Sequence, residues 1–410
     1  MRLGTLIVSI IRLVLSCCVA IIPFAVNANE LIYWIDVPKS KPTVATISVD
    51  TSQLGDFILS PSRDIPASNQ TALDISCITS QKSRLTVKYD KPIRCESIQW
   101  SVRFKPLKAN EYDASSQQSI YSPTGWWLLF EWGNLPRIIG NEAAAICVVG
   151  RDDVCKKLPD IHSAPLLFAW GKQTATITTD KLKLTLFADS TILTPELPNI
   201  SRQLERQYTY LSQVFSQNRL FDWSLIWVAI DQKYKKVGGA AGTNAYIANY
   251  LVADDELTDK TLPMLLRVSA HETVHGLSNY TLPSWINESL AEYYAFKAVQ
   301  LSMVKTSAPV DEWAKRRNTF PHADVGLYIA HKKVTEDKDM SYYPLFYLKG
   351  SAFWQELDLA LQASEKKLDD YISLLSSPNI QSTDLNQAFI DAMIKIIGSS
   401  HWATISNKYL

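Results

Sequence analysis

Residues 263–277 read PMLLRVSAHETVHGL, and this stretch decides how the surrounding chain must be arranged. A proline at its start, a glycine near its end and the apolar residues between them predict a helix. Within it, His271, Glu272 and His275 form the pattern His-Glu-x-x-His. Residues four apart share a helix face, so both imidazoles can reach one Zn²⁺ at about 2.0–2.1 Å, with Glu272 beside it to take a proton from a bound water molecule. The spacing predicts a metal site on this helix.

A catalytic zinc site also needs a third protein ligand and one open position. Residues 282–294, LPSWINESLAEYY, predict a second helix that turns back on the first. Glu288 and Glu292 are four residues apart in it, so one carboxylate can bind the metal while the other accepts the outer ring N–H of a ligand histidine. The spacing alone leaves open which glutamate has which role.

The two segments together resemble those of the gluzincins, the zinc peptidases with a glutamate ligand, which include thermolysin and the membrane-alanyl-type aminopeptidases. Residues 271–275 match the first helix of that superfamily. Residues 285–293, WINESLAEY, resemble its Trp-Leu-Asn-Glu-Gly-x-Ala-x-Tyr element. The resemblance implies that Glu288 is the third zinc ligand and that Glu292 accepts a hydrogen bond from the outer ring N–H of a ligand histidine.

A third element lies downstream, where residues 347–350 read YLKG. It is similar to the Tyr-x-Lys-Gly element of the aminopeptidases, whose tyrosine donates a hydrogen bond to the oxyanion of the reaction. The resemblance implies this role for Tyr347. The order of elements, over about residues 85–370, is most similar to the glycyl-aminopeptidase-like branch.

The chain also departs from the gluzincin pattern. The connection between the two motif helices, residues 276–287, is shorter than in thermolysin or the aminopeptidases, and Ser289 stands where the superfamily usually has glycine. Residues 238–244, GGAAGTN, take the place of the strand that borders the substrate, yet they offer no carboxylate for a free α-amino group. Backbone groups of Gly239, Gly242 and Asn244 are the expected substrate contacts, through a peptide that adds as a strand.

The first 28 residues have the character of an export signal. Arg2 and Arg12 precede an apolar run over residues 13–26, and small residues follow at 26–28. An uncleaved anchor is the alternative, but the run is shorter than the ~20 residues that span a bilayer. We expect a cleaved signal, no membrane span thereafter, and a location in the periplasm or outside the cell. The 41 basic and 41 acidic side chains balance and form no basic stripe, so nucleic acid is not an expected partner.

Four cysteines remain after the signal: Cys77, Cys95, Cys147 and Cys155. Four cysteines allow three pairings, and sequence does not choose among them. Closeness along the chain favours Cys77 with Cys95 and Cys147 with Cys155. Their spacing lacks the Cys-x-x-Cys of structural zinc, so disulfides in an oxidising compartment are the expectation.

The pattern of elements predicts a multidomain α+β protein. A β-rich, sandwich-like N-terminal domain of antiparallel strands is expected over residues 29–187, a thermolysin-like catalytic domain over 188–300, and a helical region that completes the active site over 301–410. The expected strands are residues 30–37, 43–49, 85–89, 97–104, 126–131, 182–187, 225–230 and 245–252; the expected helices are residues 200–217, 263–277, 284–299, 349–363 and 383–397.

The function that follows is an exported zinc metallopeptidase with one Zn²⁺ and a peptide or protein substrate. One alternative is a catalytically silent gluzincin-like scaffold that binds peptides or cell-envelope partners. Another is a carbohydrate or envelope adaptor, with Trp100, Trp126 and Trp127 as a sugar platform, although large aromatic side chains are more often part of a core.

Overall fold

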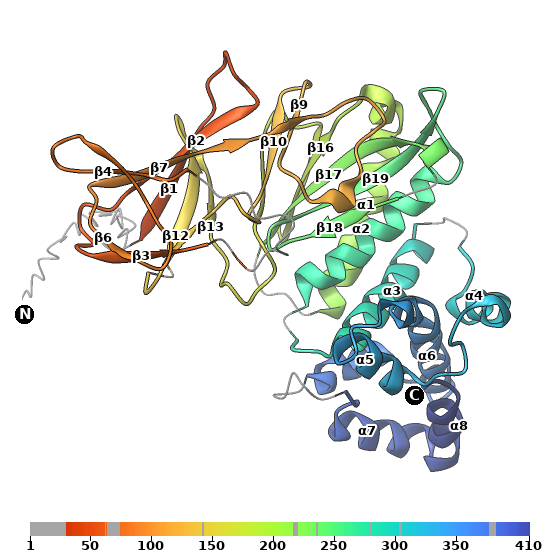
Figure 1. Cartoon of the computed structure of the whole chain (residues 1–410). Coiled ribbons are helices and arrows are strands. Elements are labelled where there is room, and N and C mark those ends of the chain that lie inside the picture. Colours follow the sequence, from red (N-terminus) through yellow and green to blue (C-terminus); the bar gives the residue numbers. More distant parts are fainter. Residues whose placement is uncertain are drawn as a thin grey trace, which may run out of the picture.

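The structure is a computed structural model, shown in Figure 1, and it describes residues 30–61, 63, 74–141, 143–215, 220–234, 237–278, 280–302, 306–376 and 383–410. Strands occupy its N-terminal part, a mixed sheet with two helices follows, and helices make up the rest. The expected export signal, residues 1–28, lies outside the described residues. In the described part of the chain, no helix has the length and apolar character that a membrane crossing requires.

The N-terminal strands form three sheets among the described residues. The largest has the order β13-β12-β1-β2-β7-β4-β5, and the others are β14-β10-β9-β8 and β11-β3-β6. Burial alternates along β1 and β2, as expected of strands with one face on a core. Their bounds are β1 Leu31–Asp36, β2 Val44–Asp50, β3 Phe57–Ser60, β4 Ser76–Ile78, β5 Arg84–Thr86, β6 Pro92–Ile93, β7 Ser97–Arg103, β8 Lys105–Pro106, β9 Ile120–Ser122, β10 Trp126–Phe130, β11 Arg137–Ile138, β12 Ala144–Val148, β13 Arg151–Lys157 and β14 Leu167–Gly171.

Two pairings differ from the antiparallel expectation. β1 pairs with β12 in parallel, and so does β8 with β9. β12 is buried along its whole length, as is typical of a strand covered on both faces, and the long connection between β1 and β12 allows them to run in the same direction. Residues 85–89 were expected as a strand, but only the short, exposed β5 forms there.

The second part of the fold is a mixed sheet with the order β15-β16-β17-β19-β18, in which β20 pairs with β19. β16, β17 and β19 are parallel, and β18 adds antiparallel at the outer edge. The helix α1 is the crossover between β16 and β17, and Ile200, Leu204, Tyr208 and Leu211 form its buried face. The bounds are β15 Ala175–Thr179, β16 Leu182–Ala188, α1 Leu197–Val214, β17 Phe221–Asp231, β18 Gly239–Ala241, β19 Ala245–Ala253, β20 Glu256–Leu257 and α2 Thr261–Leu277.

The helices after α2 pack into the same core as this sheet. One continuous cluster of buried side chains includes Leu184 of β16, Leu290 of α3 and Phe353 of α6. α3 is buried on nearly all sides, which makes it the central helix. The bounds are α3 Ser284–Gln300, α4 Pro309–Arg316, α5 Leu327–Thr335, α6 Pro344–Gln362, α7 Gln387–Ile397 and α8 Ser399–Tyr409, with the shorter 3₁₀ helices η2 Ala114–Ser116, η3 Thr191–Glu196, η4 Gln232–Tyr234, η5 Arg317–Thr319, η6 Met340–Tyr342 and η7 Leu368–Leu375.

The other face of the mixed sheet packs on the N-terminal strands. Trp126 and Leu128 of β10 share a buried cluster with Ile226 of β17 and Ile247 of β19. Trp126 and Trp100 are fully buried, so both belong to the core and cannot form a sugar platform. The domain limits at 187/188 and 300/301 stay predictions.

Both expected disulfides are present. Cys77 bonds to Cys95, and Cys147 to Cys155, with S–S distances of 2.03 and 2.08 Å. The first joins β4 to the turn before β7, and the second joins β12 to β13. Both bonds cross-link the N-terminal sheet, and both are compatible with an oxidising compartment.

Candidate metal centre

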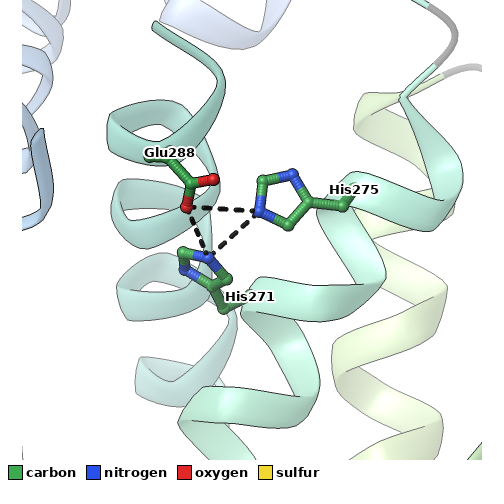
Figure 2. A group of neighbouring side chains, drawn as sticks. All are labelled: His271, His275 and Glu288. Atoms are coloured by element: carbon green, nitrogen blue, oxygen red, sulfur yellow. Dashed lines mark hydrogen bonds and ion pairs between the residues drawn. The ribbon is translucent and has the colours of Figure 1, made fainter. Parts of the chain in front are cut away.

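The candidate metal centre lies where α2 and α3 face each other. α2 packs its apolar side on the sheet and on α3 through Leu266, Ala270 and Val274. The tight connection between the helices, predicted from the short gap, sets α3 beside α2 so that the face of Glu288 meets the face of His271 and His275. Figure 2 shows the three side chains pointing toward one another.

Three potential ligand atoms converge there. His271 Nε2 lies 3.1 Å from His275 Nε2 and 3.3 Å from a Glu288 carboxylate oxygen, and the third separation, from His275 Nε2 to that oxygen, is 3.6 Å. Ligands about 2.0–2.1 Å from a tetrahedral zinc ion are separated by roughly 3.3 Å. Both the spacing and the donor set of two imidazoles and one carboxylate therefore suit Zn²⁺. In the described part of the chain, no other three such side chains come together.

Glu292 lies one turn beyond Glu288 and contacts the other side of His271. Its carboxylate is 3.0 Å from His271 Nδ1, and Arg267 bonds to its second oxygen. An acceptor at Nδ1 keeps the proton on that nitrogen and leaves Nε2 free to bind a metal. Burial opposes ionisation of Glu292, but the hydrogen bond to His271, and then the positive charge of Arg267, lower the pKa of this carboxyl below its usual value.

The electrostatics of the centre favour a cation. Burial alone would lower the pKa of His271, but hydrogen bonds to Glu288 and Glu292 outweigh burial and raise it to about 10. Burial likewise opposes ionisation of Glu288, yet its contacts with both histidines hold its pKa well below the ordinary value. The carboxylates of Glu288 and Glu292 thus favour positive charge at this site, where Arg267 bonds to Glu292 and the two imidazoles contact Glu288.

Tyr347 belongs to the same site, although it comes from α6. Its ring stacks on that of His271 at a centroid distance of 5.6 Å. Close packing of α6 on α3 sets this position: a Cβ added to Gly350 would lie 2.4 Å from Ser289 Cβ, and Trp354 donates a hydrogen bond to Ser289 Oγ. Gly350, three residues after Tyr347, and Ser289, directly after Glu288, are therefore complementary in size where the two helices touch. Burial, followed by the negative charge of Glu288, raises the pKa of Tyr347, so its phenol stays protonated.

Tyr343 is a site residue that the sequence analysis missed. Its ring meets that of Tyr347 edge-on at 5.6 Å. Burial, and then the charge of Glu288, raise its pKa to about 12, with a smaller contribution from Glu272. The sequence signal that could have identified Tyr343 was its position four residues, or one helical turn, before Tyr347.

Glu272 is half-buried beside the two histidines. Its negative charge also contributes to the raised pKa of Tyr246, which burial chiefly causes, and Tyr246 belongs to the adjacent strand β19. The charge of Glu272 thus acts on Tyr246 of the sheet as well as on Tyr343 beside α6.

The three expected substrate contacts lie at the outer edge of that sheet. Gly239 begins β18, and Gly242 and Asn244 form the turn between β18 and β19. Gly242 is buried, and a Cβ there would lie 2.4 Å from both Leu167 Cδ1 and the carbonyl oxygen of Pro165. The backbone carbonyl of Asn244 accepts a hydrogen bond from Ser224. Of these three, Gly239 is the exposed one.

No family model matches the sequence, and no curated protein matches it. The structure is similar to that of an aminopeptidase N family protein from Idiomarina loihiensis, with a TM-score of 0.55 and 11% identity over 83% of this chain and 68% of that protein. Leukotriene A4 hydrolase from Saccharomyces cerevisiae, in its native form, gives a TM-score of 0.43 and 12% identity over 92% of this chain and 66% of that protein. This chain thus spans about two thirds of their length. At 11% identity the first similarity establishes a common fold alone.

Proposed function

We propose that this protein is an exported zinc metallopeptidase. One observation carries the proposal: His271, His275 and Glu288 bring three zinc-type ligand atoms to mutual distances of 3.1–3.6 Å, and a glutamate follows the first histidine directly. The fold shared with an aminopeptidase N family protein and the two disulfides support it.

Each residue has a task in this proposal. A zinc ion held by His271, His275 and Glu288 would supply a Lewis acid and a water molecule of lowered pKa. Glu272 would accept a proton from the attacking water and donate it to the leaving amine. Tyr347, kept protonated, donates a hydrogen bond to the carbonyl oxygen as negative charge develops on it. Glu292 holds the Nδ1 proton of His271 and so fixes the orientation of that ligand.

The test compares the native protein with Glu272→Gln. Glutamine keeps the size of the side chain but cannot accept the proton, so kcat for a peptide library is expected to fall by about 10³-fold or more. Zinc content is expected to stay unchanged. Lost cleavage with retained zinc supports the assignment.

Cleavage that survives Glu272→Gln would remove Glu272 from the mechanism. Zinc in the native protein without any cleavage would favour a peptide-binding scaffold instead.

A further inference from the structure

β18 offers backbone hydrogen-bonding groups that the fold leaves available. In the described part of the chain it pairs with β19 alone and forms the edge of the mixed sheet. The carbonyl of Gly238 accepts from Asn249 N–H at 2.9 Å, and Gly242 N–H donates to Ala245 at 2.8 Å. Since inward and outward residues alternate along an antiparallel strand, Ala240 also turns toward β19, while Gly239 and Ala241 direct their N–H and C=O groups outward.

One face of β18 lies on the side of the sheet against which α2 packs. Ala241 is opposite Tyr246 in the register, and the hydroxyl of Tyr246 bonds to Ser269, two residues before His271. Directly opposed residues share a face, and Ala241 packs on the same core as α2, whereas Ala240 packs on the N-terminal strands. The Ala241 side chain, a methyl group, thus faces the metal-bearing helix.

β18 itself carries no charged side chain. The side chains from Gly238 to Gly242 are hydrogens and methyl groups. A free α-ammonium group that leaves water needs an opposite charge to compensate its desolvation.

The carboxylates of the α2–α3 site already have tasks. Glu288 and Glu292 contact His271, and Glu272 is the proton acceptor of the proposed function. Asp113 does meet β18 at Gly238, but its carboxylate accepts from the N–H and hydroxyl of Ser115 and caps η2. The edge is suited to an uncharged stretch of main chain.

We propose that β18 binds the interior of a substrate chain as an added strand, so that the protein is an endopeptidase that does not require a free α-amino group. This inference rests on the proposed peptidase function. Main-chain pairing with Gly239 and Ala241 supplies the affinity, and small side chains on β18 leave room for large residues of the substrate.

The test uses pairs of otherwise identical peptides with a free or an acetylated N-terminus, and products are mapped by mass spectrometry. Acetylation is expected to change kcat/KM by less than about threefold, because no ion pair is lost, and both peptides are expected to be cut at the same internal bonds. Release of single N-terminal residues, or a loss on the order of 100-fold on acetylation, would overturn the proposal.

A pair of variants tests the edge itself. Ala241→Pro removes an outward N–H without removing a bond to β19, a substitution that edge strands tolerate; Ala241→Ser keeps the N–H. We expect roughly tenfold lower kcat/KM for the proline variant than for the serine variant, with similar melting temperatures. Equal rates for the two variants would exclude pairing at Ala241. No Glu272-dependent cleavage of any peptide would instead refute the peptidase function, and this inference with it.

Discussion

Helix α3 takes part in two buried clusters of charge that are built in opposite ways. In the first, His271, His275 and Glu288 direct three ligand atoms at one another. In the second, about two and a half turns further along α3, the ammonium group of Lys297 lies between two carboxylates, 3.1 Å from Asp358 and 2.7 Å from Asp369. The second cluster contains its own cation, whereas the first is arranged to receive one.

The hydrogen bonds of the second cluster complete this contrast. Tyr293 donates to Asp358 at 2.6 Å and Tyr294 to Asp369 at 2.8 Å, and the backbone N–H of Leu368 also donates to Asp358. These bonds join α3 to α6 and η7. Burial of charge therefore does not distinguish a functional site from a structural one in this protein. The difference lies in whether the protein supplies the positive charge itself.

The largest effect is expected from Lys297→Met. It leaves Asp358 buried without its cation, and breaking a buried ion pair in this way costs about 3–5 kcal/mol of unfolding free energy. Zinc content should not change. Lys333→Met, in an exposed pair with Asp337, is the matched control and should lower stability far less, because solvent screens an exposed pair. Denaturant unfolding measures both, and equal losses would show that the Lys297 cluster is not structural.

Tyr347→Phe sharpens the contrast at the metal centre. Phenylalanine retains the ring that stacks on His271 but cannot donate to an oxyanion, so kcat is expected to fall by about 100-fold while KM and zinc content stay the same. Unchanged kcat would remove Tyr347 from the mechanism, and a loss of zinc would show that it only supports His271.

Glu292→Gln tests whether the carboxylate that contacts His271 Nδ1 increases zinc affinity. The amide keeps the shape but loses the charge that holds the His271 Nδ1–H, so zinc affinity is expected to fall about 10–100-fold. Competition with a chelator measures this affinity. Glu312→Gln, in a partly exposed pair with Arg316 on α4, is the control and should leave zinc affinity unchanged.

The smallest expected effect is that of Lys349 on the pH dependence of the unfolding free energy. Its ammonium group is buried and donates to the carbonyls of Ala323 and Val325, and burial lowers its pKa from 10.5 to about 8. Between these values the unfolded chain binds more protons than the folded one, so this group makes stability rise with pH from about 8 to 10.5. Unfolding free energies across that range should rise less steeply in Lys349→Met, and identical slopes would contradict the assignment.

Much of the arrangement was predictable because its signals are local. The 3.6-residue period and the proline and glycine limits predicted α2 and α3 to within two residues, and short β-rich runs predicted β1, β2, β7 and β10. Spacing of four within a helix predicted that His271 and His275 share a face, whereas the choice of Glu288 over Glu292 came from the motif resemblance. In the structure, the ligand atoms of His271, His275 and Glu288 lie together.

Features that depend on distant partners were not predictable in the same way. The parallel pairing of β1 with β12 joins segments more than a hundred residues apart, and no local pattern encodes it. Backbone groups of Gly242 were predicted to contact substrate, and nothing in the sequence indicated that the segment around Pro165 packs against this glycine. Tyr343 was missed because an aromatic residue at a helix start is more often part of a core.

The most direct test of the central claim is the zinc stoichiometry of the purified native protein, measured by elemental analysis beside the Glu288→Gln variant. Our account predicts one zinc ion per native chain, retained through dialysis, and its loss from the variant. A native protein that binds no zinc, or a variant that retains it fully, would contradict the assignment of His271, His275 and Glu288 as a metal site.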